Sequence, residues 1–396
     1  MTGAASLRRP ARIRAPLKRF DPFLRLVRSS RVPLMIQGVE HAWDLYCRRV
    51  PDPVWFERFL TPQFRAAFAA VDGCEEFAVF SAADVPPSKR SPRWRRLLKS
   101  MGHYADFDLP QKTALLRLLG TLGLYGDVEI LAAGDPPPGA GAWSDMQCRQ
   151  RLILERVRFL LREPEMKRRQ VLAFRDIAER APARAPVRLE AAIFFLSRAL
   201  EQGLPRGDVA RGTALAREAL ASLKDVLAPW EYLRWDSKYW RCISYEPYLR
   251  GRPDEARRQL ARAEESARDC IRRTPPGEAL FGLEDLYGVL TTTVLTEIKL
   301  GRPERCRGIL QELISMDPEG SWQRLELGRV LAAAGDVEGA MDSLSEAVRL
   351  GPPRRAEACR LLAQCCSTLG RRARAEEWRR ESERLKKAEE FRGGAR

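Results

Sequence analysis

Six basic side chains and one tryptophan gather between Lys89 and Lys99 without a single acidic residue. Basic groups bind phosphate oxygens and a tryptophan ring stacks on a base, so this composition suits non-specific binding to nucleic acid or to acidic lipid. The alternative is the solvated start of a helix that buries Trp94, Leu97 and Leu98. The candidate residues for this anion-binding surface are Lys89, Arg90, Arg93, Trp94, Arg95, Arg96 and Lys99.

Catalytic chemistry has little support in the sequence. The two histidines, His41 and His103, have no partners at metal-ligand spacing, and a lone histidine is more often structural than a general base. Neither a glycine-rich phosphate loop nor the Gly-x-Ser-x-Gly turn of a nucleophilic serine occurs. The sequence therefore predicts no catalytic residue, metal site or cofactor. An unfamiliar active site within residues 33–133 stays an open alternative.

Positive charge is concentrated at the N-terminus. Residues 1–100 carry 19 Lys and Arg against 9 Asp and Glu, a net +10 of the total +16. Any attraction to anionic partners is therefore expected there. The chain also has 59 Arg, 10 Lys and no Asn, a bias that GC-rich coding produces without selection for binding. Charge alone thus leaves open whether the arginines are functional.

The cysteines and the hydropathy pattern bear on the compartment. Nine cysteines form no Cys-x-x-Cys pair, which indicates small core residues in a reducing compartment. The chain has no apolar run of the roughly 18 residues that a membrane-spanning helix requires, and no secretory signal. We expect a cytoplasmic protein. An Arg-rich, acid-poor opening is also typical of an organelle transit peptide, so organelle targeting is the alternative if the source is eukaryotic.

Proline, glycine and charge divide the chain into five parts. We expect a flexible basic arm (1–32), an N-terminal helical region (33–133), a Pro/Gly linker (134–144), helices of degenerate repeats (145–236) and a repeat region (237–391) with two clear and two loose units. Apolar periodicity predicts the individual helices, and a short strand over 77–80 is the one alternative to helix. The expected helices are 34–49, 53–71, 93–101, 111–125, 145–162, 165–180, 187–202, 208–227, 230–249, 253–272, 278–300, 303–316, 321–334, 337–350, 355–369 and 372–391.

Small residues recur at fixed places in the last part. In the strongest unit, 321–354, Gly328 and Ala340 are small where two helices would touch, and Gly335 permits a left-handed turn. The same turn recurs at Gly251, Gly301 and Gly370. With Leu327, Leu331, Leu344, Ala347 and Pro352, this pattern resembles the tetratricopeptide repeat. We therefore expect an all-α fold: an α-solenoid of antiparallel helix pairs with an N-terminal helical region.

That resemblance implies a superhelix whose first helices line a concave groove for a peptide or a partner's helix. The groove positions that carry over are Lys238, Arg241, Tyr245, Lys299, Arg329, Arg360 and Gln364. This cationic lining suits an acidic peptide or a free carboxylate, because Arg and Lys form charge-assisted hydrogen bonds with carboxylates. The alternative is arginine that merely coats solvent-facing helix. The carboxylate clamp of chaperone-type members uses Asn, which this chain lacks, so capture of a C-terminus is not expected.

Seven aromatic residues lie between Trp230 and Tyr248. They are either anchors for a partner or core between adjacent hairpins, and the shared face of Trp235 and Tyr239 favours core. Together the patterns predict a non-enzymatic scaffold or adaptor that binds a protein or peptide partner, with acidic character in that partner. The alternative is a protein associated with RNA or DNA through its basic N-terminal half. The sequence does not determine the oligomeric state.

Overall fold

The computed structural model describes residues 83, 87–89, 92–122, 124–135, 139, 141–161, 164–275, 279–317, 320–350 and 354–394, and none of these lies in a strand. The expected arm (1–32), the helices over 34–49 and 53–71 and the strand over 77–80 lie outside these residues. The helices are α4 (Pro92–Gly102), α5 (Leu109–Leu122), α6 (Tyr125–Ala133), α7 (Asp145–Leu161), α8 (Pro164–Arg180), α9 (Pro186–Glu201), α10 (Arg206–Leu223), α11 (Pro229–Ile243), α12 (Tyr245–Leu249), α13 (Pro253–Arg273), α14 (Ala279–Lys299), α15 (Arg307–Met316), α16 (Ser321–Ala333), α17 (Val337–Leu350), α18 (Arg355–Thr368) and α19 (Arg372–Gly394).

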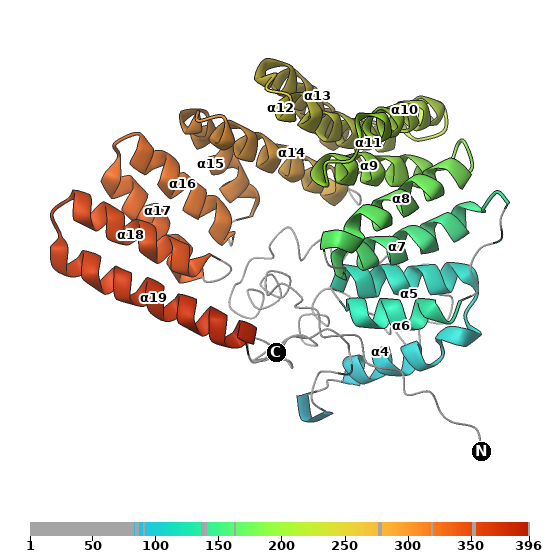
Figure 1. Cartoon of the computed structure of the whole chain (residues 1–396), viewed down its shortest axis with the longest axis horizontal. Helices are drawn as coiled ribbons and strands as arrows, with labels where there is room; N and C mark the ends of the chain where they lie inside the picture. The colour runs from blue at the N-terminus through green and yellow to red at the C-terminus, as the bar shows by residue number, and fades with distance from the viewer. Residues whose placement is uncertain are drawn as a thin grey trace.

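The helices pack as consecutive antiparallel pairs into an arc, so the expected α-solenoid is confirmed (Figure 1). The first helices of the pairs form one row: α5, α7, α9, α11, α14, α16 and α18. The second helices form another: α6, α8, α10, α13, α15, α17 and α19. At the top of Figure 1, α10 and α13 form the outer rim, whereas α9, α11 and α14 of the first-helix row lie nearer the centre of the arc.

Five of the pairs end their first helix in the same glycine turn. Gly203, Gly251, Gly301, Gly335 and Gly370 have φ between +62° and +83°, a region that costs other residues free energy. In each turn the residue after the glycine donates its N–H to the carbonyl five residues earlier, over 2.8–2.9 Å, which is a Schellman motif. Four of these turns were predicted from the sequence. The turn at Gly203 was not, and it adds a regular hairpin, α9–α10.

The predicted helix over 230–249 is two helices. Pro247 has no N–H to donate to the carbonyl of Ile243, so α11 ends at Ile243 and α12 begins at Tyr245. The other predicted helices from residue 145 onward match the structure to within a few residues, apart from 208–227, where α10 already ends at Leu223. In 303–316 the first four residues form a 3₁₀ turn.

Close helix contacts follow the predicted pattern of small residues. A Cβ added at Gly328 on α16 would lie 2.6 Å from Cγ of Leu344 and 3.3 Å from the carbonyl oxygen of Ala340, both on α17. The predicted close approach in the strongest repeat is therefore confirmed. Aromatic side chains of α11 also belong to the core: Tyr239 is buried in the core cluster, and Tyr232, Trp235 and Trp240 pack against that cluster.

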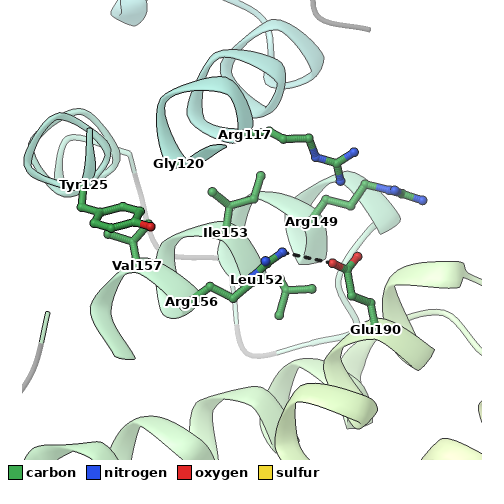
Figure 2. Close-up of a pocket in the computed structure, with 9 residues that line it drawn as sticks. All are labelled: Arg117, Gly120, Tyr125, Arg149, Leu152, Ile153, Arg156, Val157 and Glu190. Atoms are coloured by element: carbon green, nitrogen blue, oxygen red, sulfur yellow. Dashed lines mark hydrogen bonds and ion pairs between the residues drawn. The ribbon is translucent and has the colours of Figure 1, made fainter. Parts of the chain in front are cut away.

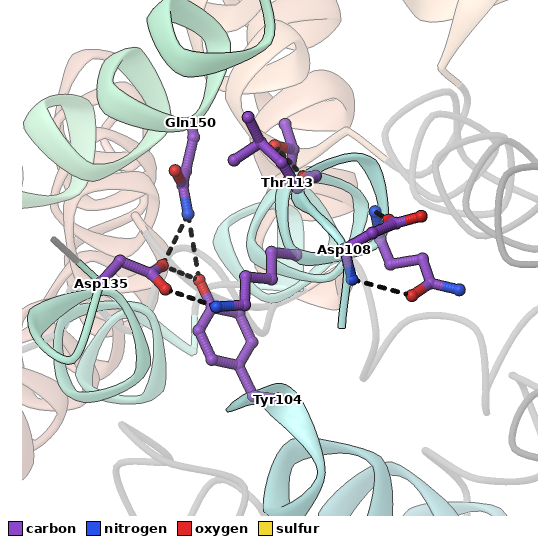
Figure 3. A network of polar contacts seen from close by, with 8 residues as sticks. Tyr104, Asp108, Thr113, Asp135 and Gln150 are labelled. Carbon is purple, nitrogen blue, oxygen red and sulfur yellow. Dashed lines mark hydrogen bonds and ion pairs between the residues drawn. The ribbon is translucent and has the colours of Figure 1, made fainter. Parts of the chain in front are cut away.

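The helices on either side of the Pro/Gly stretch 134–144 pack directly against one another, because α5 contacts α7. Figure 3 shows the polar network that joins them. Asp135, just after α6, accepts hydrogen bonds from the hydroxyl of Tyr104 (2.5 Å), from Nζ of Lys112 on α5 (2.7 Å) and from Nε2 of Gln150 on α7 (2.6 Å). Burial, followed by the bond to Asp135, raises the pKa of the Tyr104 hydroxyl. The carboxylate of Asp135 thus joins the end of α6 to α5 and α7 at the start of the stack.

Candidate ligand-binding surface

A pocket of about 110 Å³ opens between three members of the first-helix row (Figure 2). Its charged lining consists of Arg117 from α5, Arg149 and Arg156 from α7, and Glu190 from α9. The lining therefore holds three guanidinium groups and one carboxylate. Asp145 on α7 also pairs with Arg149 at 2.6 Å, so among these residues the formal surplus is one positive charge. Such a surplus attracts an oxyanion, because the planar guanidinium matches the geometry of carboxylate and phosphate.

The pKa of Glu190 indicates that the electrostatic potential inside this pocket is positive. The Glu190 carboxylate lies 3.3 Å from Nη1 of Arg156. Burial alone would raise the pKa of Glu190, but the positive charges of Arg156, Arg117, Lys238 and Arg149 outweigh burial and lower it. The pocket thus stabilises a carboxylate that is held there.

Apolar side chains form the floor of the pocket. Leu152, Ile153 and Val157 on α7 are buried, and Tyr125 on α6 closes one side. Arg156 also lies over the ring of Phe194, 4.4 Å from its centroid. A low-dielectric floor strengthens charge interactions at the mouth, so the arginines act on a ligand more strongly than they would on open surface.

A second charged region runs along the seam between α11 and α14. Asp285 on α14 accepts a hydrogen bond from Nε of Arg234 at 2.9 Å and pairs with Nζ of Lys238 at 3.4 Å. Burial lowers the pKa of Lys238, and the charge of Asp285 acts against that shift. Burial also raises the pKa of the neighbouring Glu284 to about 6. Lys238 is therefore a positioned member of a buried ion-pair network rather than a freely exposed cation.

Three other predicted groove residues continue along this seam. Nη1 of Arg241 lies against Gly288 of α14, only 1.9 Å from where a Cβ would be, and within the described residues its guanidinium has no ion-pair or hydrogen-bond partner. Tyr245 stacks on Tyr248 with ring centroids 5.8 Å apart. Lys299, at the end of α14, lies 5.9 Å from the centroid of Tyr248. Tyr248 thus links Tyr245 on α12 to Lys299 at the end of α14, whereas Arg241 on α11 contacts α14 at Gly288.

The remaining predicted groove residues fall into two groups. Arg329 on α16 is engaged by Glu326, at 3.6 Å, and by Glu357 of α18, so its charge is already neutralised. Arg360 and Gln364 on α18 are exposed, one turn apart, and their side chains have no hydrogen-bond or ion-pair partner within the described residues.

The predicted anion-binding segment begins in a short 3₁₀ turn, Pro87–Lys89, and continues in α4. Arg95 and Lys99 are exposed, one turn apart on α4, and Leu97 is fully buried. The position of Arg90 and the side chains of Lys89, Arg93, Trp94 and Arg96 lie outside what the structure describes.

Sequence reasoning missed the pocket residues Arg117, Arg149, Arg156 and Glu190. Arg156 and Glu190 are 34 residues apart, a separation that a pair of helices spans, and this was the available signal. It was obscured because α7 and α9 lack the small-residue pattern that marks the later repeats.

Within the described part of the chain, no cluster of three His, Cys, Asp or Glu side chains could hold a metal ion. None of the described helices combines the length and the apolar character needed to cross a bilayer.

No protein-family model matches the sequence, and no curated protein matches it. Among solved structures, the chain is similar to a "Circular tandem repeat protein with novel repeat topology and enhanced subunit contact surfaces". That likeness has 15% sequence identity, covers 96% of this chain and 98% of the other, and has a TM-score of 0.19. A TM-score this low carries no weight, so the assignment to an all-helical repeat solenoid rests on the helix packing and the repeated glycine turns of the chain itself.

Proposed function

We propose that this protein is a non-enzymatic scaffold that holds an acidic peptide segment of a partner on its first-helix row. Solenoids of helix pairs present long continuous surfaces, and such surfaces serve binding more often than catalysis. The tetratricopeptide-like unit over 321–354 supports the same class of function. The partner's chemistry is argued from the charges on the row.

The observation that carries the proposal is the surplus of cations on that row. The pocket between α5, α7 and α9 sets three arginines against Glu190. Further along, Arg241 is partly buried without a partner among the described residues. Keeping an unpaired guanidinium partly out of water costs free energy, which an incoming carboxylate would recover through charge-assisted hydrogen bonds.

Peptides of equal length that alternate serine with glutamate, glutamine or lysine test the proposal. We expect the full chain to bind the glutamate peptide best, and the affinity to fall as salt screens the charges. Arg241→Glu with Lys299→Glu should weaken that binding by about tenfold or more, because each reversal replaces attraction with repulsion. The matched control is Arg258→Glu with Arg272→Glu, which makes the same charge change on exposed positions of α13. Equal affinity for the three peptides would contradict the proposal.

A second candidate function is association with RNA or DNA through α4. The observation that favours it is the exposure of Arg95 and Lys99 on one face of that helix, where both can reach phosphates. Titration of labelled single-stranded RNA and duplex DNA tests it, and absence of binding at low salt and micromolar protein would remove it.

A further inference from the structure

The pocket between α5, α7 and α9 lies outside the repeats that resemble the tetratricopeptide pattern, so no groove position of that family accounts for it. Its charged residues come from three helices that are far apart in sequence and are brought together only by the stacking of the row. We propose that this pocket is a specific oxyanion site that takes one side-chain carboxylate of the acidic partner segment. The proposal deepens the proposed function and rests on it for the identity of the ligand.

The size of the pocket fits such a group. The pocket volume is about 110 Å³. On the same measure of volume, a cavity needs only about 10 to 15 Å³ to hold one water molecule. A carboxylate with its adjoining methylene, or a phosphate, therefore fits. The buried Leu152 and the methyl groups of Ile153 and Val157 offer contacts for the methylene.

The donors also suit a ligand carboxylate. Arg149 binds Asp145 on its own helix through Nε at 2.6 Å, and a guanidinium has five N–H groups, so one carboxylate does not saturate it. Arg117 and Arg149 reach the pocket from different helices, as Figure 2 shows, and Glu190 already occupies the Arg156 side. A ligand carboxylate would thus lie within reach of N–H groups of both Arg117 and Arg149.

Gly120 provides a way to close the pocket without changing a charge. It lies on α5 in the pocket lining, and a Cβ there would meet methyl groups of Ile153 and Val157 at 3.9 and 4.0 Å, which is ordinary contact. Alanine should therefore fit at this position. The longer side chain of Gly120→Leu would extend into the space that the ligand needs.

The pocket itself is tested first with isolated anions. The melting temperature of the full chain is measured in sodium acetate and in inorganic phosphate, each against sodium chloride of equal ionic strength. Because a ligand that binds only the folded state stabilises it, we expect acetate and phosphate to raise the melting temperature. The rise should disappear in Gly120→Leu and in Arg117→Gln with Arg149→Gln, and persist in Gly120→Ala. No rise with either anion, or a rise that all variants share, would overturn the proposal whatever the peptides do.

The source of the carboxylate is tested with the peptides. Gly120→Leu, and separately Arg117→Gln with Arg149→Gln, should weaken glutamate-peptide binding about tenfold or more, as the loss of charge-assisted hydrogen bonds requires. Arg258→Gln with Arg272→Gln on α13 should change it less than about twofold. Unchanged peptide affinity in both pocket variants would refute the assignment to the peptide. Failure of the parent chain to bind any acidic peptide would instead refute the proposed function, while the acetate and phosphate result would still decide the pocket. Circular dichroism confirms that each variant is folded.

Discussion

Arg257 on α13 grips Glu297 on α14 with two parallel hydrogen bonds, Nε to Oε1 at 2.6 Å and Nη2 to Oε2 at 3.0 Å. The side chain of Glu297 is only 5% exposed, so water has little access to replace the guanidinium. The carbonyl of Glu297 meanwhile accepts the hydrogen bond that closes the glycine turn at Gly301. This single residue links the pairing of adjacent hairpins to the turn that ends α14.

The first prediction concerns this pair. Arg257→Met should lower the free energy of unfolding by about 3 kcal/mol, because it leaves a buried carboxylate without its partner. Arg258→Met is the control: Arg258 is exposed and has no partner within the described residues, so its loss should change stability by less than about 0.5 kcal/mol. Urea unfolding measures both. Equal stability of the two variants would show that other groups stabilise the charge of Glu297 when Arg257 is absent.

The second prediction concerns the close contact at Gly328. Glycine to alanine inside a helix ordinarily stabilises it by about 1 kcal/mol. Here the added methyl would overlap Leu344, so Gly328→Ala should instead destabilise by about 1 to 3 kcal/mol, and Gly328→Trp by more. Gly308→Ala on α15 meets no atom within 4 Å and should be neutral or mildly stabilising. A Gly328 variant that melts like the parent would disprove the α16–α17 register.

The third prediction treats the glycine that the sequence analysis did not identify. Gly203→Ala should cost about 1 to 2 kcal/mol, as should Gly335→Ala, because both residues have positive φ and alanine is strained there. Gly207→Ala, four residues on with negative φ and open space around it, should cost nothing. Thermal unfolding of the three variants gives the comparison. A Gly203→Ala variant as stable as the parent would mean that the turn adopts another backbone conformation in which alanine is not strained.

These glycines show why the fold was largely predictable. A left-handed turn requires a positive φ at one residue, which glycine adopts readily. Gly335 and the other turn glycines therefore mark these turns in the sequence. Even Gly203 stands in a Gly-Leu-Pro triplet like the Gly-Arg-Pro triplets at Gly251 and Gly301. It was missed because α9 lacks the small-residue pattern of the later units.

The candidate site was less predictable because it depends on how successive hairpins align. The turn glycines are spaced 48, 50, 34 and 35 residues apart. Because this spacing is irregular, the sequence position of a residue in one first helix does not predict which residue of the next first helix lies beside it. Arg329 was expected to line the groove, yet Glu357 from the following helix engages it. Arg117 and Arg149 share a pocket only because α5 stacks on α7, a contact that nothing in either helix encodes alone.

The fourth prediction follows from the raised pKa of Glu284, about 6. Because burial raises this pKa above that of the unfolded chain, the native state binds the proton more tightly. The contribution of Glu284 to stability is therefore full below about pH 4.5 and is lost as the pH rises through 6, by at most about 2 kcal/mol. Glu284→Gln should be more stable than the parent at pH 7 and closer to it at pH 4.5. Urea unfolding at both pH values measures this difference, and a gap that does not change with pH would contradict it.

The last prediction separates the two candidate functions through α4. Arg95→Gln with Lys99→Gln removes two exposed charges far along the stack from Arg241, so acidic-peptide affinity should change by less than about twofold. Log affinity for duplex DNA falls linearly with log salt concentration, and each phosphate contact contributes about −0.9 to that slope. If Arg95 and Lys99 both contact phosphates, the slope of the variant should therefore be less negative by about 1.8. The control is Arg258→Gln with Arg272→Gln, which removes equal charge from α13 and should leave the slope unchanged. A loss of peptide binding in the α4 variant would place the acidic partner on α4 rather than on the first-helix row. A DNA slope that both variants alter equally would mean that net charge, and not α4, attracts the nucleic acid.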